Sequence, residues 1–451
     1  MKPNSRNIAL QALLQVAENE GYSNIVIDKM IRQTKPEPRE AALASALFYG
    51  VLEKQIALDW VLGQFSKKPV DRLDAPVREI LRLAVYQILY LDKIPDSAAV
   101  NEAVNSCREV GKSSAAGFVN GILRNLLRRR EQLSWPSQGE EALSIRYGCP
   151  VHWIRFWRSV YGEVFCQKLL ESLSQPAELF VRVNPLRCSM AEFLEQAEKL
   201  HLGAAAVEGV PFAVQLAHPG SVAENPLYQQ GWFHVQDLSS QVCCLLAEVR
   251  PDMKVVDVCA APGGKTFTAA EWMENRGKLF SYDLYKGKVK LIRTGANRLG
   301  LSCVQTAVRD AAKPAASGST APEDSPECAD VVFCDAPCSG LGILRRKPEI
   351  RYKTLESLQG LPAIQKQILS ESARLVRPGG RLVYSTCTLN PAENGEIANW
   401  FLQQHPDFEP VVISVPHGMK RAVEEPENQF TMAPFSCGTD GFFVALFQKK
   451  P

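Results

Sequence analysis

The first part of the chain alternates between apolar and polar positions with the period of an α-helix. Apolar side chains recur every three or four residues over 77–89 and over 118–127, a spacing that places them on one face of a helix. Similar patterns cover 7–16 and 40–52, and proline-containing segments separate them. Several amphipathic helices with short connections predict a compact all-α domain over residues 1–134.

After this helical part, the pattern of apolar positions becomes mixed. Pro136, Ser137 and Gly139 indicate a short linker. Residues 140–230 then combine helical periodicity with a short apolar strand at 180–183. This combination predicts a small α+β linking module.

From residue 231 to residue 451 the chain alternates between short apolar runs and helical patterns. The strands that these runs predict lie at 254–258, 278–283, around Val304, at 329–335 and at 381–385. Near-continuous apolar strands separated by helices are typical of a mostly parallel, doubly wound α/β sheet of the Rossmann-like kind. A last strand at 442–447 should form an antiparallel pair at the sheet edge. The stretch 313–328, rich in Ala, Ser and Pro, should be a surface insertion with no catalytic role.

Composition excludes several classes of protein. Of the 451 residues, 46% are hydrophobic and 22% are charged, which excludes a wholly disordered chain. No run approaches the roughly 20 consecutive apolar residues of a membrane-spanning helix. The first residues also lack the apolar core of a signal peptide. We therefore expect a cytoplasmic protein that enters no membrane.

The net charge of +2 conceals two basic regions. Residues 1–134 carry 19 basic and 15 acidic side chains, a local charge of +4. Residues 340–381 carry nine basic and three acidic side chains, a local charge of +6, and the helix expected after 278–283 adds further Lys and Arg. Because basic surfaces bind phosphate groups, a nucleic acid is a candidate partner.

The thirteen cysteines give no sign of disulfides or of a metal site. Their number is odd and their spacing is irregular, and without an export signal the thiols should be reduced. The sequence has no Cys-x-x-Cys pair and no His-x-x-x-His pair among its six histidines. We therefore expect no bound metal.

A loop with two glycines follows the first of these strands. It consists of Cys259, Ala260, Ala261, Pro262, Gly263, Gly264 and Lys265. Its spacing matches neither the Gly-x-Gly-x-x-Gly dinucleotide signature nor a P-loop. The glycines nevertheless let a ligand approach the backbone at the N-terminus of the following helix.

Three aspartates lie at or just after the carboxyl ends of predicted strands, namely Asp283, Asp310 and Asp335. Any one of them is explained equally well as a cap of the following helix. Together they converge on the crevice at which parallel sheets bind ligands. Asp283, 19 residues after Gly264, is placed to accept hydrogen bonds from ribose hydroxyls, and Asp310 from an adenine amino group.

Two cysteines also follow strand ends. Cys338 belongs to the run Asp-Ala-Pro-Cys-Ser-Gly at 335–340, and Cys387 belongs to Tyr-Ser-Thr-Cys-Thr at 384–388. Each cysteine alone is more often a buried structural thiol. Since parallel strands end at the same edge of a sheet, the two thiols should face one crevice.

The loop at 259–265, the aspartates and both cysteine motifs together resemble the class I S-adenosylmethionine-dependent methyltransferases, in the RNA cytosine-C5 subfamily. The resemblance implies that the loop, Asp283, Asp310 and Asp335 bind S-adenosylmethionine. Lys265 is either a contact of the cofactor carboxylate or an orienting contact of Asp335.

Methylation at carbon 5 of cytosine explains why a thiol is needed. Carbon 5 is a poor nucleophile until a thiolate adds to carbon 6, and the thiolate can leave again afterwards. Asp335 is placed to hydrogen-bond the ring nitrogen and the exocyclic amine of the base. Spacing alone leaves the attacking cysteine open, because the Pro-Cys motif of DNA cytosine methyltransferases would select Cys338. The resemblance to the RNA enzymes implies that Cys387 is the nucleophile and that Cys338 acts in product release.

The N-terminal part resembles the NusB-like RNA-binding domain over roughly residues 5–130. The runs that carry this resemblance lie at 22–24, 81–87, 94–95, 98–104 and 115–124. The Arg-Val-Asn-Pro run at 182–185 resembles the linking module that precedes the catalytic domain in RNA cytosine methyltransferases. This combination implies a 16S ribosomal RNA substrate, in a single-stranded or looped region where a base can be unstacked, and no obligate protein partner.

Two other functions remain open at this point. A transfer-RNA cytosine-C5 methyltransferase would share the catalytic motifs but would not be expected to carry the N-terminal domain. A non-catalytic RNA-binding assembly factor would share the N-terminal domain but would have no use for the loop, the aspartates and the paired cysteine motifs.

Overall fold

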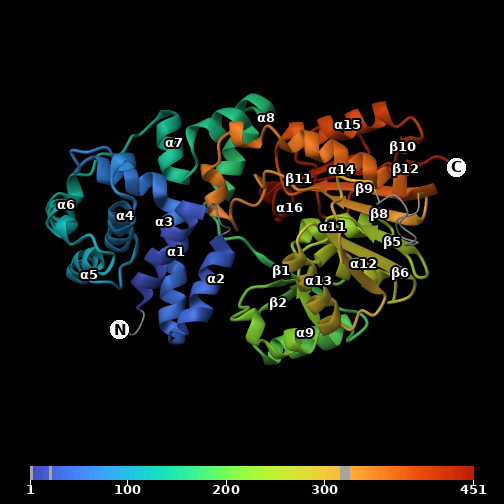
Figure 1. Cartoon of the computed structure of the whole chain (residues 1–451), viewed down its shortest axis with the longest axis horizontal. Helices are drawn as coiled ribbons and strands as arrows, with labels where there is room; N and C mark the ends of the chain where they lie inside the picture. Colours follow the sequence, from blue (N-terminus) through green and yellow to red (C-terminus); the bar gives the residue numbers. More distant parts are fainter. Residues whose placement is uncertain (1–3, 20–22, 315–325) are drawn as a thin grey trace. The chain divides into compact units, whose positions relative to one another are not determined.

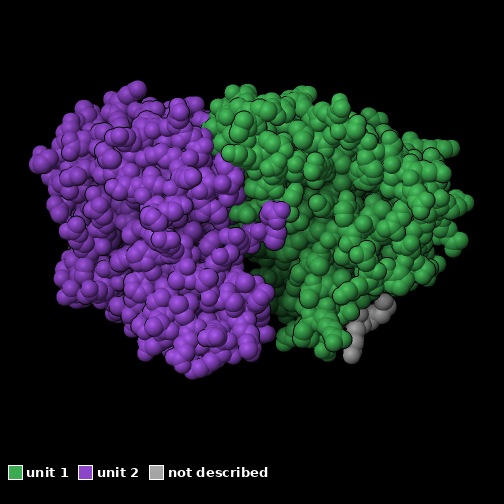
Figure 2. Space-filling view, turned by 180° about the vertical axis from the view of Figure 1, so that it is seen from behind, with its two compact units in different colours: residues 1–174, 344–353 green, residues 175–343, 354–451 purple. Residues whose placement is uncertain are grey.

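The computed structural model describes residues 4–19, 23–314 and 326–451. The chain forms two compact units, coloured green and purple in Figure 2. The first unit comprises residues 1–174 and 344–353, and the second comprises residues 175–343 and 354–451. The segment 344–353 therefore returns to the first unit between two parts of the second.

The first unit is all-helical, as its periodicity predicts (Figure 1). Its α-helices are α1 (Ser5–Asn19), α2 (Ser23–Thr34), α3 (Pro38–Gly63), α4 (Ala75–Tyr90), α5 (Asp96–Glu109), α6 (Ala116–Arg128), α7 (Gly139–Tyr147) and α8 (Val151–Ser172). Its 3-10 helices are η1 (Val70–Arg72), η2 (Ser113–Ala115), η3 (Arg130–Gln132) and η6 (Pro348–Tyr352). Helix α3 begins at Pro38, which is possible because the first helical turn does not need the N–H that proline lacks.

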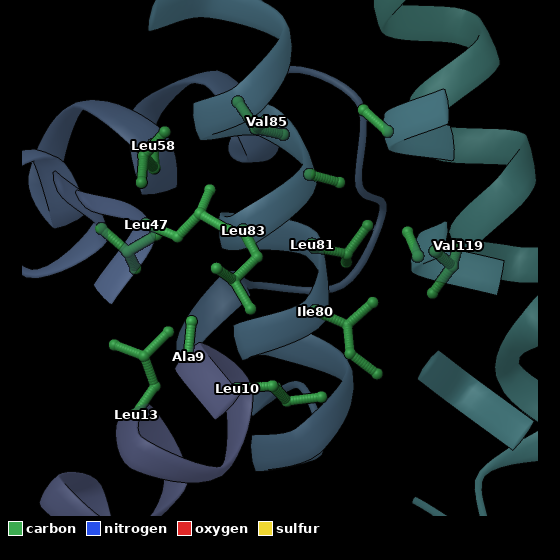
Figure 3. Close-up of a cluster of buried hydrophobic side chains, with 14 of the residues drawn as sticks. Ala9, Leu10, Leu13, Leu47, Leu58, Ile80, Leu81, Leu83, Val85 and Val119 are labelled. Carbon is green, nitrogen blue, oxygen red and sulfur yellow. The ribbon is translucent and has the colours of Figure 1, made fainter. Parts of the chain in front are cut away.

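The apolar faces of α1, α3, α4 and α6 meet in the core of the first unit, where Leu47 and Leu81 are fully buried (Figure 3). The length and composition of α3 would suffice to cross a membrane. Its residues Phe48, Val51 and Leu58 are instead buried in this core. Core helices of this kind pass the same test, so α3 is weak evidence for a membrane span.

The segment 344–353 is anchored in the first unit by Arg351, which is only 2% exposed. Its guanidinium donates to the carbonyls of Tyr147 at 3.3 Å, Gly148 at 3.2 Å and Leu344 at 3.4 Å. Trp153 Nε1 donates in return to the Arg351 carbonyl at 2.9 Å. Helices α7 and α8, within the predicted linking module, therefore belong to the first compact unit. Arg351, counted in the basic region at 340–381, is not available to a phosphate.

The second unit begins with a small antiparallel sheet of strand order β2-β3-β1-β4. Its strands are β1 (Leu179–Val183), β2 (Ala204–Ala206), β3 (Ala213–Leu216) and β4 (Phe233–Val235), and its helices are η4 (Val222–Glu224), α9 (Met190–Lys199) and α10 (Pro226–Gln229). Ser189 and Glu192 form a capping box that starts α9. The predicted α+β character of the linking module is confirmed.

The larger sheet has the strand order β10-β12-β9-β8-β5-β6-β7, and β11 pairs with β12. Its strands are β5 (Lys254–Asp257), β6 (Lys278–Asp283), β7 (Val304–Val308), β8 (Ala329–Asp335), β9 (Val376–Thr386), β10 (Phe408–Pro410), β11 (Gln429–Met432) and β12 (Phe442–Lys449). Neighbouring strands from β5 to β9 pair in parallel, which confirms the predicted mostly parallel sheet. The chain moves from one side of β5 to the other after β7, so the topological switch point lies between β5 and β8.

One detail differs from the predictions. Strand β9 starts at Val376, five residues before the predicted strand at 381–385, and its register is irregular opposite Ala329 and Val331. The last strand, β12, forms an antiparallel pair at the sheet edge as predicted, and its partner in that pair, β10, is the outermost strand. The predicted surface insertion lies mostly outside the described residues.

Helices cover both faces of the larger sheet (Figure 1). They are α11 (Leu238–Leu246), α12 (Gly264–Trp272) and α13 (Lys286–Leu299) on one face, and α14 (Leu361–Leu375) and α15 (Gly395–Gln404) on the other. Successive residues of a strand point to opposite faces of the sheet. Val255 therefore packs in the core on the face covered by α11, α12 and α13, and Val256 packs in the core on the face covered by α14 and α15. Shorter helices lie at η7 (Glu356–Leu358), η8 (Pro391–Glu393) and α16 (Pro434–Cys437).

A buried ion pair joins the small sheet to the larger one. Arg182 Nε on β1 lies 2.6 Å from Glu271 Oε2 on α12, and both side chains are at most 1% exposed. The Arg182 guanidinium also lies 5.0 Å from the centre of the Trp272 ring. The first residue of the Arg-Val-Asn-Pro run therefore connects the linking module to the helix that follows the glycine loop.

Replacing Arg182 alone should destabilise the second unit strongly. The variant Arg182→Met leaves the Glu271 carboxylate buried beside His234, 3.3 Å away. The loss of the charged partner costs about 3–5 kcal/mol in the free energy of unfolding. Urea denaturation followed by tryptophan fluorescence measures the change. The double variant Arg182→Met with Glu271→Leu is the control, and it should be more stable than the single variant. A single variant as stable as the unaltered protein would contradict this account.

Candidate active site

The loop at 259–265 joins β5 to α12 and is held to both neighbours of β5. The Ala260 N–H donates to the carbonyl of Tyr282 on β6 at 2.8 Å. The N–H of Val258, just before the loop, donates to the carbonyl of Phe333 on β8 at 3.0 Å. The loop is therefore fixed at the topological switch point, where open parallel sheets bind ligands.

Gly263 allows α12 to begin directly at the carboxyl end of β5. Gly263 has a φ of +118°, and a Cβ built on it would lie 2.3 Å from the Phe267 ring. A side chain at Gly263 is therefore excluded both by conformation and by space. Gly264 opens the helix, and the first turn of a helix has N–H groups without intrahelical acceptors. The start of α12 thus offers donors to a polar ligand.

Asp283 and Asp310 lie at the carboxyl ends of neighbouring strands, but their burial and their hydrogen bonds differ. Asp283 ends β6 and is buried, and its Oδ1 accepts a hydrogen bond from the Tyr285 N–H at 3.0 Å. Asp310 lies two residues after β7 and is partly exposed. Its carboxylate accepts from Lys313 at 3.0 Å and from the Ala312 N–H at 3.1 Å, and these bonds hold its pKa below the ordinary value. Asp283 is therefore the more enclosed of the two.

A fourth aspartate at this edge, Asp257, has no role in the sequence-based prediction. It ends β5, and burial raises its pKa to about 7, although a hydrogen bond of 2.8 Å from the Thr266 hydroxyl opposes this shift. Its Oδ1 has no hydrogen-bond partner among the described residues. The sequence carries the same signal for Asp257 as for Asp283, because each aspartate is the last residue of a buried apolar strand.

Asp335 is oriented through both of its oxygens. Lys265 Nζ lies 2.7 Å from Asp335 Oδ2, and the Ser385 hydroxyl donates to Asp335 Oδ1 at 2.7 Å. Burial lowers the pKa of Lys265, but the Asp335 carboxylate more than reverses this, so the ammonium stays charged. Of the two contacts considered for Lys265, the structure contains the one with Asp335.

Cys338 and Cys387 meet at the carboxyl ends of adjacent strands. Strands β8 and β9 run in parallel with Asp335 opposite Ser385, so the residues that follow them lie side by side. The two Sγ atoms are 3.3 Å apart. The hydrogen bond with Cys387, together with burial, raises the pKa of Cys338 well above its ordinary value. Cys338 is therefore held as a thiol that can donate to the Cys387 sulfur.

The C-terminal turn at 439–441 packs against the Cys387 turn. The Gly342 N–H donates to the Cys387 carbonyl at 3.0 Å, and the Gly441 N–H donates to the Gly342 carbonyl at 2.9 Å. A Cβ on Gly342 would lie 1.9 Å from the Gly441 carbonyl oxygen, so no side chain fits there. The Asp-Gly turn thus closes one side of the cysteine pair.

Two further cysteines of the second unit, Cys243 and Cys334, are buried and held as thiols. Burial raises the pKa values of Cys243 and Cys334 to about 12, so these thiols are unreactive near neutral pH. Over residues 4–19, 23–314 and 326–451, no group of three or more His, Cys, Asp or Glu side chains could hold a metal ion.

Several side chains of the basic region at 340–381 already form ion pairs within the second unit. Arg374 lies 3.1 Å from Glu371, Arg377 lies 2.7 Å from Asp330, and Arg381 lies 3.3 Å from Glu248. On α13, Arg298 lies 3.7 Å from the centre of the Tyr228 ring and donates to the Phe233 carbonyl at 3.0 Å. The exposed basic residues of α13 are Lys286, Lys288, Lys290 and Arg293. This exposed face is the better candidate for phosphate contacts.

Three families match consecutive parts of the chain. The NusB family matches residues 3–128, the ferredoxin-like domain of RsmF/B-like methyltransferases matches 149–223, and the family described as 16S rRNA methyltransferase RsmB/F matches 244–448. Their order is the order of the NusB-like, linking and catalytic parts that the sequence motifs resemble.

Two curated relatives align with the chain over almost its whole length. The chain is 36% identical to the probable ribosomal RNA small subunit methyltransferase B of Bacillus subtilis, over 100% of this chain and 99% of that protein. It is 32% identical to the protein of the same name from Synechocystis, over 99% of each. The crystal structure of PH0851 superposes with a TM-score of 0.85 and 26% identity over 100% of both chains. NSun6 from Pyrococcus horikoshii, with a TM-score of 0.60, 20% identity and coverage of 67% of this chain and 98% of its own, shares the fold.

Proposed function

Because the chain belongs to the RsmB/F family of 16S rRNA methyltransferases, we propose that it transfers a methyl group from S-adenosylmethionine to carbon 5 of one cytosine in 16S ribosomal RNA. The observation that carries this choice of atom is the pair of thiols with sulfurs 3.3 Å apart. Methylation of an oxygen or an amine needs no thiol. Carbon 5 needs a nucleophile that adds to carbon 6 and leaves again.

The residues at the switch point fit S-adenosylmethionine, which supplies the methyl group on a sulfonium. The loop at 259–265 leaves no room for a side chain at Gly263 and presents the N–H groups of α12 to a carboxylate. The buried carboxylate of Asp283 would hold the ribose hydroxyls, and Asp310 would lie at the adenine. Asp335 and Lys265 would lie at the reacting end of the bound cofactor.

Asp283 should contribute more to cofactor affinity than Asp310. Asp283→Ala removes a buried, charged acceptor, a loss of about 1.5–3 kcal/mol, so the Kd for S-adenosylmethionine should rise on the order of 10- to 100-fold. Asp310→Ala is the control and should have a smaller effect, because this partly exposed carboxylate already pairs with Lys313. Isothermal calorimetry measures both affinities. Equal effects, or a larger one for Asp310, would contradict the assignment.

In the first stage of the proposed reaction, Cys387 is the nucleophile. The hydrogen bond from the Cys338 thiol favours the thiolate form of the Cys387 sulfur. The thiolate adds to carbon 6, and the electron pair of the double bond becomes available at carbon 5. Asp335, oriented by Lys265 and Ser385, holds the ring nitrogen and the exocyclic amine.

In the second stage, the adduct must collapse. The hydrogen on carbon 5 leaves as a proton to a water molecule, the electrons of its bond restore the double bond between carbons 5 and 6, and the Cys387 sulfur leaves carbon 6 with the electrons of its bond. We assign Cys338 to this stage, because in the structure it lies against the sulfur that has to leave. The resemblance to the RNA cytosine-C5 methyltransferases, which carry both cysteine motifs, also supports Cys387 as the nucleophile and Cys338 in product release.

We propose that the target cytosine lies in a single-stranded or looped region, since the base has to leave its stack to reach the thiols. The exposed basic face of α13 would contact the phosphates nearby. The NusB-like part would add a second RNA contact. We place the activity in the cytoplasm, with no obligate protein partner.

Transfer of a labelled methyl group to 16S rRNA tests the proposal directly. Purified protein with S-adenosylmethionine should label the RNA, and bisulfite sequencing should place the product at one cytosine. Labelling of transfer RNA but not of 16S rRNA would favour the transfer-RNA enzyme. Failure of the protein to bind S-adenosylmethionine in calorimetry would favour a non-catalytic assembly factor.

A further inference from the structure

Glu393, at the end of η8, is fully buried, and it is linked to the residues on both sides of Cys338, directly on one side and through Gln365 on the other. Its Oε2 accepts hydrogen bonds from the Ser339 N–H at 2.8 Å and from Gln365 Nε2 at 2.9 Å. Gln365 Nε2 also donates to the Pro337 carbonyl at 3.0 Å. The residues before and after Cys338 are therefore tied to one carboxylate.

Asn394, the next residue, makes the corresponding contacts around Cys387. The Thr386 hydroxyl donates to Asn394 Oδ1 at 2.5 Å, and Asn394 Nδ2 donates to the Thr388 carbonyl at 2.9 Å. A hydrogen bond of 2.6 Å between the hydroxyls of Ser339 and Thr388 then joins the two cysteine turns directly. Two consecutive side chains thus bracket the two thiols, one each.

This buried polar arrangement is costly for the fold. A carboxylate without water is tolerated only when donors replace its hydration, and Glu393 also accepts from Asn390 Nδ2 at 2.9 Å. Gln365 buries its own Oε1 with no partner among the described residues, a cost that an apolar side chain would avoid. Costly polar groups retained beside the thiols are typical of a functional requirement.

We infer that Glu393 and Asn394 are positioning residues for the two thiols, with Glu393 holding Cys338 and Asn394 holding Cys387. The inference rests on the proposed function, because it concerns the two stages of that reaction. Both side chains are buried and act through the turn that carries the cysteine. Loosening one turn should therefore impair the stage in which its own cysteine acts and spare the other stage.

The test compares Glu393→Gln and Asn394→Ala in the full-length protein with S-adenosylmethionine and 16S rRNA. Denaturing gels measure the covalent protein–RNA complex, and rapid quench measures methyl transfer in the first turnover. Small displacements of a reacting group cost up to about 100-fold. Glu393→Gln should slow product release on the order of 10- to 100-fold and accumulate the complex. Asn394→Ala should slow formation of the complex by a similar factor.

Asn399→Ala is the control, because Asn399 lies on α15 five residues after Asn394, and its Oδ1 accepts a hydrogen bond from Gln429 instead. Both stages should keep the rates of the unaltered protein. If Glu393→Gln fails to fold, Gln365→Ala replaces it, since it removes the same link to Pro337. Thermal melting shows which variants fold.

The outcomes separate the inference from the function on which it rests. If the variants of Cys338 and Cys387 show exchanged roles, Glu393 and Asn394 should exchange theirs as well, and the positioning inference stands. If both positioning variants slow the same stage, or neither changes a rate once folded protein is counted, the inference is overturned. No methyl transfer by the unaltered protein would overturn the proposed function and the inference together.

Discussion

Cys387→Ala should abolish methyl transfer and leave no covalent protein–RNA complex. Without a sulfur at this position nothing adds to carbon 6, and carbon 5 stays unreactive, so the rate should fall on the order of 10⁴-fold or more. Binding of S-adenosylmethionine should change little, because the cofactor loop and Asp283 belong to other turns. Methyl transfer to 16S rRNA and calorimetry measure the two quantities side by side.

Cys107→Ala is the matched control for this loss. Cys107 is a fully buried thiol on α5, in the core of the first unit. The same chemical change there removes packing only, so the enzyme should stay active at a temperature where it is folded. Activity of Cys387→Ala above a hundredth of the unaltered rate would contradict its role as the nucleophile.

Cys338→Ala should have the opposite effect on the covalent complex. The Cys387 sulfur can still add to carbon 6, but the second stage loses its assisting thiol, so the methylated adduct should persist. A band of protein bound to RNA should appear on denaturing gels only when S-adenosylmethionine is present. Multiple-turnover methylation should fall to a small fraction of the normal rate.

The double variant Cys338→Ala with Cys387→Ala is the control for that band, and it should form no complex. A complex that accumulates with Cys387→Ala and is absent with Cys338→Ala would mean that the two roles are exchanged. This outcome would be compatible with the 3.3 Å contact, because either sulfur can be the donor in it.

Much of the fold was predictable from local pattern. A helix that buries one face must repeat every three or four residues, and a strand buried on both faces must be apolar throughout. The carboxyl ends of such strands carry Asp283 and Asp335, and the cysteines follow strand ends in the same way. Parallel pairing then brings these ends to one edge without further information.

Local pattern could not predict the long-range polar contacts. Arg182 and Glu271 are separated by 89 residues, and neither position differs in pattern from an exposed charged residue. Arg351 counts as a basic surface residue by composition, yet it is buried in the first unit. Glu393 follows a proline in a short turn, where a solvent-exposed carboxylate would be the ordinary expectation.

The sequence by itself therefore determined the class of fold, the loop, the strand-end aspartates and both cysteine motifs, because each depends on periodicity or on neighbours along the chain. The tertiary structure decided that Lys265 contacts Asp335, that the sulfurs of Cys338 and Cys387 come within 3.3 Å, and that Glu393 supports one of them. These contacts depend on how elements pack, and packing brings together residues whose separation along the chain carries no periodic signal.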